Sequence, residues 1–323
     1  MLLAIDVGNT NISFGVLEGE ALRHHLRCES ARARTADEYA VLVRQMLDLR
    51  GVPLARIDSA IIASVVPPLT DTMVGLVERA FGIEPLVVGP GIKTGMAILY
   101  ENPREVGADR IVNAVAAHEW VKRKAEPARP HGGGRAEAPR DVAPERVVAP
   151  ERVVAPERVV APERVVALES GGEPAPGVIV VDFGTATTFD CVTPKGEYLG
   201  GVIAPGIQIS AEALFSRAAR LSRVEIALPP RVVGRNPVHS MQSGIVYGYA
   251  GLVDGLVGRL RRELGYPCRV VATGGLARLI APQTETIEAV DDDLTLTGLR
   301  LLYERNTAPA ASAPPAARAG DLD

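Results

Sequence analysis

The chain has 323 residues, of which 47% are hydrophobic and 23% charged, and it carries a formal net charge of −4. This composition is that of a globular protein long enough for two domains, and it gives no general attraction to nucleic acid. No apolar run approaches the roughly 20 residues that a membrane helix needs, and the N-terminus reaches Asp6 without the features of a signal peptide. Three widely spaced cysteines argue against a disulfide scaffold or a zinc site. We therefore expect a cytoplasmic protein, with no nucleic-acid or membrane partner, that acts on something small.

Prolines divide the chain unevenly, since twelve of the 25 lie in residues 125–176 and 307–323. The first of these segments contains four perfect copies of Ala-Pro-Glu-Arg-Val-Val, from Ala143 to Val166. A proline at every sixth residue removes backbone donors and disfavours helix. We expect a solvated, disordered-looking insertion without chemistry of its own, and a β-helix of hexapeptide repeats is the alternative. The chain then divides into an N-terminal domain (1–124), the insertion (125–176), a C-terminal domain (177–306) and a flexible tail (307–323).

The remaining 254 residues alternate between strand-like and helix-like stretches. In the first half, strands are expected at 2–7, 11–16, 59–66 and 86–88, and two prolines end the third of them. Helices are expected at 39–49, 71–81 and 111–120. A capping box of Thr35 and Glu38 precedes the first helix. In the second half, strands are expected at 178–181 and 187–192, helices at 210–221 and 243–264, and a strand at 269–272. This alternation indicates an α/β protein.

An internal match links the two halves. Residues 4–16 align with residues 180–192, and each stretch is an apolar strand ending in Asp, then any residue, then Gly, small polar residues and a second strand. A single copy is explained equally well by a plain hairpin with Asp and Gly as turn residues. Two copies, each opening its half of the chain, predict two similar domains that face each other.

Both turns carry residue types that bind phosphate and metal. Gly8 lacks a Cβ and lets a ligand approach the backbone closely, and Asp6 is placed to hold a hydrated Mg²⁺ through one carboxylate. The side-chain donors for phosphate oxygens are Asn9, Thr10 and Asn11 in the first turn and Thr185, Thr187 and Thr188 in the second. The two commonest glycine-rich nucleotide signatures are absent, which does not exclude nucleotide binding. Thr273-Gly274-Gly275, after an apolar strand, is a weaker indication of an adenosine site.

Asp109 and Arg110 begin the expected helix at 111–120. A carboxylate there can accept a proton from a substrate hydroxyl, and a guanidinium beside it offers a fork for an anionic group. The alternative is that Asp109 merely caps the helix, and taken in isolation this is the simpler interpretation.

Taken together, these motifs resemble those of the type III pantothenate kinases, within the acetate and sugar kinase/Hsc70/actin superfamily. The motifs that carry the resemblance are Asp6-Val-Gly-Asn-Thr-Asn11, Gly107-Ala-Asp-Arg110, Asp182-Phe-Gly-Thr-Ala-Thr-Thr188, Gly201-Val-Ile-Ala-Pro-Gly206, Met241-Gln-Ser-Gly244 and Thr273-Gly-Gly275. They span nearly all of the 254 core residues, in the family's order. The resemblance implies two ribonuclease-H-like (actin-like ATPase) domains in tandem and the phosphorylation of pantothenate by ATP with Mg²⁺, the first step of coenzyme A synthesis.

The resemblance also implies roles for individual residues. The first ATP loop matches Asp6, Val7, Gly8, Asn9, Thr10, Asn11, Ile12 and Ser13, and a second ATP contact matches Thr185. Asp109 matches the proton acceptor, and Asp182 the ligand of a monovalent cation, K⁺ or ammonium. The substrate site matches Tyr100, Gly107, Ala108, Asp109 and Arg110. A cytoplasmic homodimer is implied as well.

One departure from the family's pattern is Pro237, which stands where the family has a threonine near the substrate. A proline side chain donates no hydrogen bond. Two alternatives therefore remain beside pantothenate: a kinase for another small hydroxylated substrate, and a nucleotide-binding transcriptional regulator of the same fold. The intact aspartates favour an enzyme, and the absence of a basic stripe disfavours the DNA-binding alternative.

Overall fold

The computed structural model describes residues 1–125, 175–218 and 221–308. The repeat insertion expected at 125–176 lies almost wholly outside the described residues, and so does the tail expected at 307–323. None of the described helices is long and apolar enough to cross a membrane.

The first sheet has five strands in the order β3-β2-β1-β4-β5. Its strands are β1 (Leu2–Val7), β2 (Asn11–Glu18), β3 (Ala21–Glu29), β4 (Ser59–Ser64) and β5 (Leu86–Val87). β1, β2 and β3 pair antiparallel, whereas β4 pairs parallel with both β1 and β5. One face packs against α1 (Ala36–Asp48) and α2 (Pro67–Phe81) through a buried hydrophobic core that includes Ile5, Phe14, Tyr39 and Met73.

The second sheet has six strands in the order β11-β10-β7-β8-β9-β6. Its strands are β6 (Ala97–Ile98), β7 (Gly177–Phe183), β8 (Ala186–Val192), β9 (Glu197–Pro205), β10 (Cys268–Thr273) and β11 (Ala289–Val290). β7, β8 and β9 form an antiparallel meander, and β10 and β11 continue parallel to β7. This is the connectivity of the first sheet, with β6 added at the edge. The expected duplication of a ribonuclease-H-like α/β unit is therefore confirmed.

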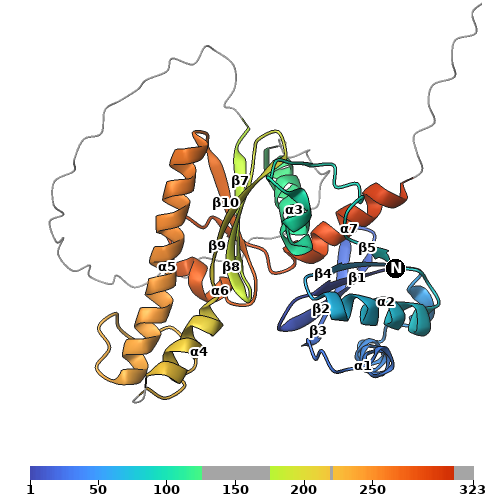
Figure 1. Ribbon diagram of the computed structural model, residues 1–323, viewed down its shortest axis with the longest axis horizontal. Coiled ribbons are helices and arrows are strands. Elements are labelled where there is room, and N and C mark those ends of the chain that lie inside the picture. Colours follow the sequence, from blue (N-terminus) through green and yellow to red (C-terminus); the bar gives the residue numbers. More distant parts are fainter. Residues whose placement is uncertain (126–174, 219–220, 309–323) are drawn as a thin grey trace, which may run out of the picture. The chain divides into compact units, whose positions relative to one another are not determined.

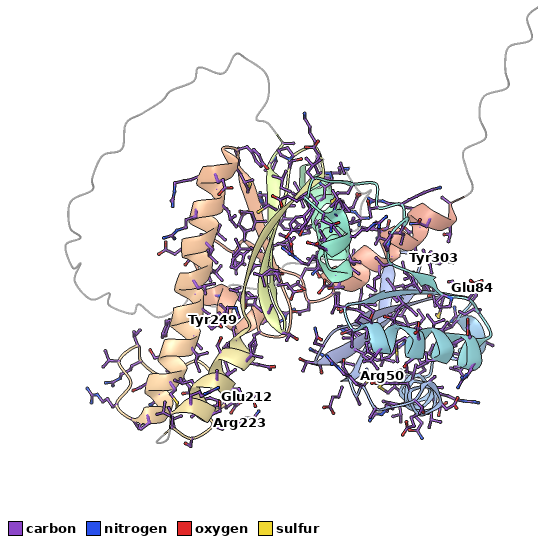
Figure 2. All side chains as sticks on the ribbon, in the orientation of Figure 1. Arg50, Glu84, Glu212, Arg223, Tyr249 and Tyr303 are labelled. Carbon is purple, nitrogen blue, oxygen red and sulfur yellow. The ribbon has the colours of Figure 1, made fainter. Side chains whose placement is uncertain are left out.

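Helices cover both faces of the second sheet (Figure 1). One face packs against α4 (Ile207–Arg217), α5 (Pro237–Leu264) and α6 (Ala277–Ile280), and the other packs against α3 (Ala108–Ala125). Tyr249 of α5, labelled in Figure 2, joins α4 to the end of β9, since its hydroxyl lies 2.6 Å from Ser210 Oγ and donates to the Pro205 carbonyl over 2.9 Å.

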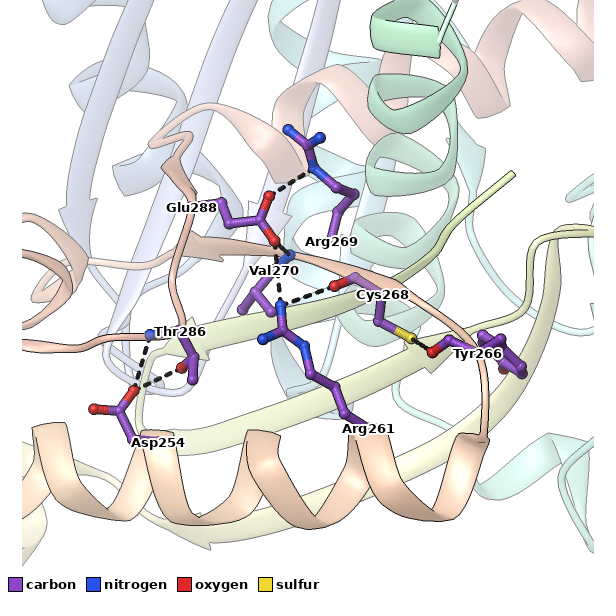
Figure 3. Close-up of polar contacts among 8 residues, drawn as sticks. All are labelled: Asp254, Arg261, Tyr266, Cys268, Arg269, Val270, Thr286 and Glu288. Atoms are coloured by element: carbon purple, nitrogen blue, oxygen red, sulfur yellow. Dashed lines mark hydrogen bonds and ion pairs between the residues drawn. The ribbon is translucent and has the colours of Figure 1, made fainter. Parts of the chain in front are cut away.

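Polar contacts from α5 fix the strand that leads to the Thr273-Gly274 turn (Figure 3). Arg261 donates to the carbonyl of Cys268 over 2.9 Å and to Glu288 over 3.2 Å. Asp254 accepts bonds from the amide and the hydroxyl of Thr286, over 3.0 and 2.7 Å. Cys268 and Thr286, which flank the segment from β10 through the Thr273-Gly274 turn, are thereby both attached to α5.

Two helices connect the halves of the chain. α3 packs on β7 and β8 of the second sheet, although it comes before the insertion, and α7 (Leu294–Thr307), at the end of the described chain, packs on β1 and β4 of the first. The two helices also pack on each other so closely that a Cβ at Gly298 would collide with the backbone carbonyl of Val112. Three short 3₁₀ turns, at Leu54–Arg56, Pro103–Glu105 and Ala281–Gln283, complete the described elements.

Most expected elements are present, with differences at their ends. The capping box at Thr35 and Glu38 is confirmed, but Pro67 and Pro68, expected only to end a strand, form the first turn of α2, where a missing amide donor costs nothing. The helix expected at 243–264 begins at Pro237, because Asn236 caps it. The helix expected at 210–221 is Ile207–Arg217. Strands β3, β6, β9 and β11 and helix α7 were not expected.

Candidate active site

The two repeated turns lie face to face. In the first, between β1 and β2, the Gly8 amide donates to the Asn11 carbonyl over 3.0 Å; in the second, between β7 and β8, the Gly184 amide donates to the Ala186 carbonyl over 3.1 Å. The hydroxyls of Thr10 and Thr185, one from each turn, are 3.1 Å apart. Residues 175 positions apart in the sequence thus belong to one site.

A cleft of about 830 Å³ opens between these turns. Ten of the expected site residues line it: Asp6, Gly8, Asn9, Thr10, Asn11, Ser13, Asp109, Asp182, Thr185 and Thr188. The Thr273-Gly274-Gly275 turn also lines it, as expected for the adenosine side of the cleft. Further lining residues were not expected, among them His25, Arg27, Gln208, Arg278, Asp292 and Thr295.

Several expected residues lie outside the cleft lining. The side chains of Val7 and Ile12 are fully buried in the core of the first sheet, which leaves only their peptide groups to face a ligand. Thr187, expected as a phosphate donor, is also fully buried, unlike its cleft-lining neighbour Thr188. Tyr100 does not line the cleft, and neither do Gly107, Ala108 and Arg110, the chain neighbours of Asp109.

Three carboxylates meet at the cleft with little positive charge to balance them. Burial, followed by the charges of Asp109 and Asp182, raises the pKa of Asp6 to about 8. Burial, followed by the charge of Asp109, raises the pKa of Asp182 to about 7, and burial also raises the pKa of Asp109. Such mutual repulsion is relieved when a cation binds. This cluster is therefore suited to a metal ion and to the phosphates that accompany it.

The carboxylates are not arranged as a chelating cage. Among the described residues, no group of three or more His, Cys, Asp or Glu side chains is placed to hold one metal ion. Mg²⁺ commonly keeps several waters and is held through one or two carboxylates together with substrate phosphates. A site with separate aspartates on a wide cleft fits that mode of binding.

Asp182 is oriented by residues from three elements. The Asn113 side chain of α3 donates to Asp182 over 3.1 Å, and Thr295 of α7 donates to Asn113 over 2.7 Å. Gly274 is left-handed, with φ of 92°, and a Cβ there would lie 2.5 Å from the Asp182 carboxylate. Neither Asn113 nor Thr295 was found from the sequence, because each acts through a contact between distant segments.

Asp109 lies in the first turn of α3, where its carboxylate accepts the Arg110 amide over 2.8 Å. A Cβ at Gly107 would lie 2.6 Å from this carboxylate, so the glycine gives it room. Asp109 thus bonds to a helix-start amide and also lines the cleft beside two other aspartates. Asp109 is the second residue of the helix and not its capping residue, and its catalytic role stays a prediction.

Arg110 and Tyr100 belong to a buried polar cluster next to the cleft. Arg110 donates from Nε to Asp190 over 2.7 Å, and the Tyr198 hydroxyl donates to the same carboxylate over 2.8 Å. Asp190 is fully buried, and the Tyr100 ring centre lies 6.4 Å from that of Tyr198. Arg110 Nη2 is buried without a hydrogen-bond partner, although it lies 2.7 Å from Asp190. Asp190 was not identified from the sequence. The signal that could have identified it is its position as a charged residue within an apolar strand.

The sequence is similar to a known protein family over most of its length. A family model described as "Type III pantothenate kinase" matches residues 2–126 and 157–259. The type III pantothenate kinase of Myxococcus xanthus is 50% identical over 308 residues, which cover 95% of this chain and 100% of that protein. The type III pantothenate kinase of Moorella thermoacetica is 48% identical over 307 residues, with 95% and 100% of the two chains covered.

A solved structure has a similar fold. It is a Baf family protein from Campylobacter jejuni, named as a transcriptional activator, with a TM-score of 0.50, 15% identity and coverage of 94% of this chain and 98% of that one. At this identity the likeness shows the fold alone. The family model and the relatives, by contrast, match over most of this sequence. The chain therefore belongs to the type III pantothenate kinase family.

Proposed function

We propose that this protein transfers the terminal phosphoryl group of ATP to the hydroxyl of pantothenate, the first step of coenzyme A synthesis. One observation carries the proposal: the facing turns, 3.1 Å apart at Thr10 and Thr185, open onto one cleft with Asp6, Asp109 and Asp182. Phosphoryl transfer depends mainly on positioning and on charge neutralisation, and this cleft offers groups for both.

The two turns would hold the nucleotide. The peptide groups from Asp6 to Ser13, with the side chains of Asn9, Thr10 and Asn11, are donors for phosphate oxygens, and Thr185 adds a donor from the second turn. Asp6 would hold Mg²⁺ through one carboxylate. When bound, the ion would neutralise part of the charge of the phosphates. The Thr273-Gly274-Gly275 turn supplies the close backbone approach for the adenosine.

Asp109 would accept the proton of the pantothenate hydroxyl as it attacks the phosphorus. Its carboxylate lies on the cleft in electrostatic contact with Asp6 and Asp182, where the phosphates are expected. Burial raises its pKa, and a raised pKa makes a carboxylate a better proton acceptor once ionised. Cations on both neighbouring aspartates would favour the ionised form.

Asp182 would hold a monovalent cation, K⁺ or ammonium. Its buried carboxylate has a pKa raised to about 7 and a fixed orientation from Asn113. A cation bound there would add positive charge beside the phosphates in a site without a P-loop lysine.

The substrate would bind next to Asp109, between Gly107, Ala108, Arg110 and Tyr100. The chain's own contribution is the guanidinium of Arg110, which Asp190 orients through Nε and Nη2, each 2.7 Å from its carboxylate. An oriented guanidinium suits the carboxylate of pantothenate.

A homodimer is the proposed assembly, in the cytoplasm and without nucleic acid. Eleven large hydrophobic side chains are exposed in the described chain, and seven of them fall between residues 203 and 238, namely Ile203, Ile209, Leu214, Leu228, Val232, Val233 and Val238. They come from β9, α4, the start of α5 and the segment between these helices. Apolar residues concentrated in this way mark an interaction surface, and we assign it to a second copy of the chain.

The function is tested by giving purified protein pantothenate and Mg·ATP, in either K⁺ or Na⁺. We expect phosphopantothenate to form, faster in K⁺, and to be largely lost in the Asp109→Asn variant, which keeps the size of the side chain but cannot accept the proton. Binding of ATP without phosphorylation of any acceptor would contradict the proposal and favour a regulator. Faster phosphorylation of another pantothenate-like alcohol would move the assignment to that substrate.

A further inference from the structure

The cleft contains more negative than positive charge, and most of its positive charge is already paired. Arg278 forms an ion pair with Asp292 at 2.5 Å, and His25 lies 2.8 Å from Asp293. Of the basic residues that line the cleft, Arg27 alone has no ion pair with any residue that the structure describes. A ligand with several negative charges therefore meets one unengaged guanidinium on entering this cleft.

The position of Arg27 places it near the expected phosphates. It belongs to β3 and is paired in register with Ser13, at the end of the first ATP loop. Its guanidinium lies 3.6 Å from the Cβ position of Gly275, which belongs to the second half of the chain. Arg27 thus spans the cleft from the first sheet to the Thr273-Gly274-Gly275 turn.

Arg27 also acts on the carboxylate expected to hold Mg²⁺. Both side chains line the same cleft, and Arg27 is the positive charge that acts on Asp6 there. Arginine suits such a position because its planar fork binds two phosphate oxygens at once.

We propose that Arg27 binds the terminal phosphates of ATP and supplies the side-chain cation that this cleft has in place of a P-loop lysine. The proposal on Arg27 rests on one part of the proposed function, namely that ATP binds in the cleft. It does not depend on which alcohol accepts the phosphoryl group.

The test compares three variants of the full chain. Arg27→Met removes the charge and keeps most of the length of the side chain, and Arg27→Lys keeps the charge but loses the fork. Arg23→Met is the matched control, because it removes the same net charge from the same strand at a residue that does not line the cleft and is paired with the exposed Glu18 instead. Calorimetry without the second substrate measures the affinities for ATP, ADP and adenosine, and steady-state kinetics follow.

We expect Arg27→Met to weaken ATP binding about tenfold to hundredfold, the range for a charged hydrogen bond. ADP should lose less, and adenosine should bind as it does to the unaltered protein. Arg27→Lys should recover part of the ATP affinity, and Arg23→Met should change it less than about twofold, as for a screened surface charge.

Equal losses of ATP and adenosine affinity in Arg27→Met would overturn the proposal, and so would a loss no larger than that in Arg23→Met. Thermal unfolding of each variant separates a local effect from misfolding, and Arg27→Lys provides a second measurement if the methionine variant is unstable. If the proposed function were wrong but this proposal right, the protein would not phosphorylate pantothenate, and its affinity for ATP would still depend on Arg27.

Discussion

Arg110 and Asp190 form an ion pair in which both groups are withdrawn from water: the side chain of Asp190 is fully buried and that of Arg110 is 10% exposed. The pair joins the start of α3 to the middle of β8, 80 residues away. It orients a guanidinium that directly follows the expected proton acceptor. The position of Arg110 is therefore determined by the second sheet.

Removing Asp190 should cost stability as well as substrate affinity. In Asp190→Ala the buried Arg110 loses its counter-charge and the Tyr198 hydroxyl loses its acceptor, which should lower the free energy of unfolding by about 3–5 kcal/mol. Urea denaturation measures this change. The matched control is Asp37→Ala, which breaks the exposed Arg79–Asp37 pair at 2.9 Å and should cost no more than about 1 kcal/mol. Equal costs in the two variants would show that Asp190 is not an electrostatic anchor.

At Gly274 even one added methyl group should disturb the proposed cation site at Asp182. In Gly274→Ala a methyl group must displace the Asp182 carboxylate or the backbone of Phe183. Misplacement of catalytic groups by about 1 Å costs roughly a hundredfold in rate, so kcat should fall by about that factor and its stimulation by K⁺ should be lost.

The control for this substitution is Gly265→Ala, at the end of α5. Gly265 is also left-handed, with φ of 71°, but has open space around its Cβ position. It should cost only the backbone strain of about 1–2 kcal/mol and leave K⁺ stimulation intact. Retained K⁺ stimulation in Gly274→Ala would argue against a cation at Asp182.

The apolar surface between residues 203 and 238 should control assembly. Val233→Asp places a charge on a side chain that is 77% exposed, and it should convert a dimer into a monomer, because an unpaired charge in an apolar interface is costly. Sedimentation velocity measures the mass. Leu49→Asp, at an 84% exposed leucine outside this surface, should leave the dimer unchanged. A Val233→Asp protein that remains dimeric would place the interface elsewhere.

The repeat insertion should be dispensable for turnover. None of the expected site residues falls within residues 125–176, and the entropy of closing a loop depends only weakly on its length. Replacing this segment with a short flexible linker should leave kcat and both KM values nearly unchanged in a steady-state assay. A folded but inactive deletion protein would show that the insertion takes part in function.

The sequence predicted the two turns well, because each is a local pattern of strand, Asp, Gly and small polar residues that is repeated in the chain. It did not predict β3, whose alternating side chains are mostly polar and exposed, and His25 and Arg27 were missed with it. Asp190 and Asn113 were missed for another reason. Their partners, Arg110, Asp182 and Thr295, lie far away in the sequence, so only the folded chain brings them together.

α3 has a mechanical consequence for the chemistry. Asp109 and Asn113 are four residues apart on this helix, about 6 Å along its axis, and Asn113 orients Asp182. The proposed proton acceptor and the amide that orients the proposed cation ligand are thus one helical turn apart, on a helix that Asp190 holds through Arg110 and that packs against Gly298 at Val112. Opening or closing of the cleft would then move Asp109 and Asn113 together, and the Asp182 carboxylate bonded to Asn113 would keep its distance from the proposed base.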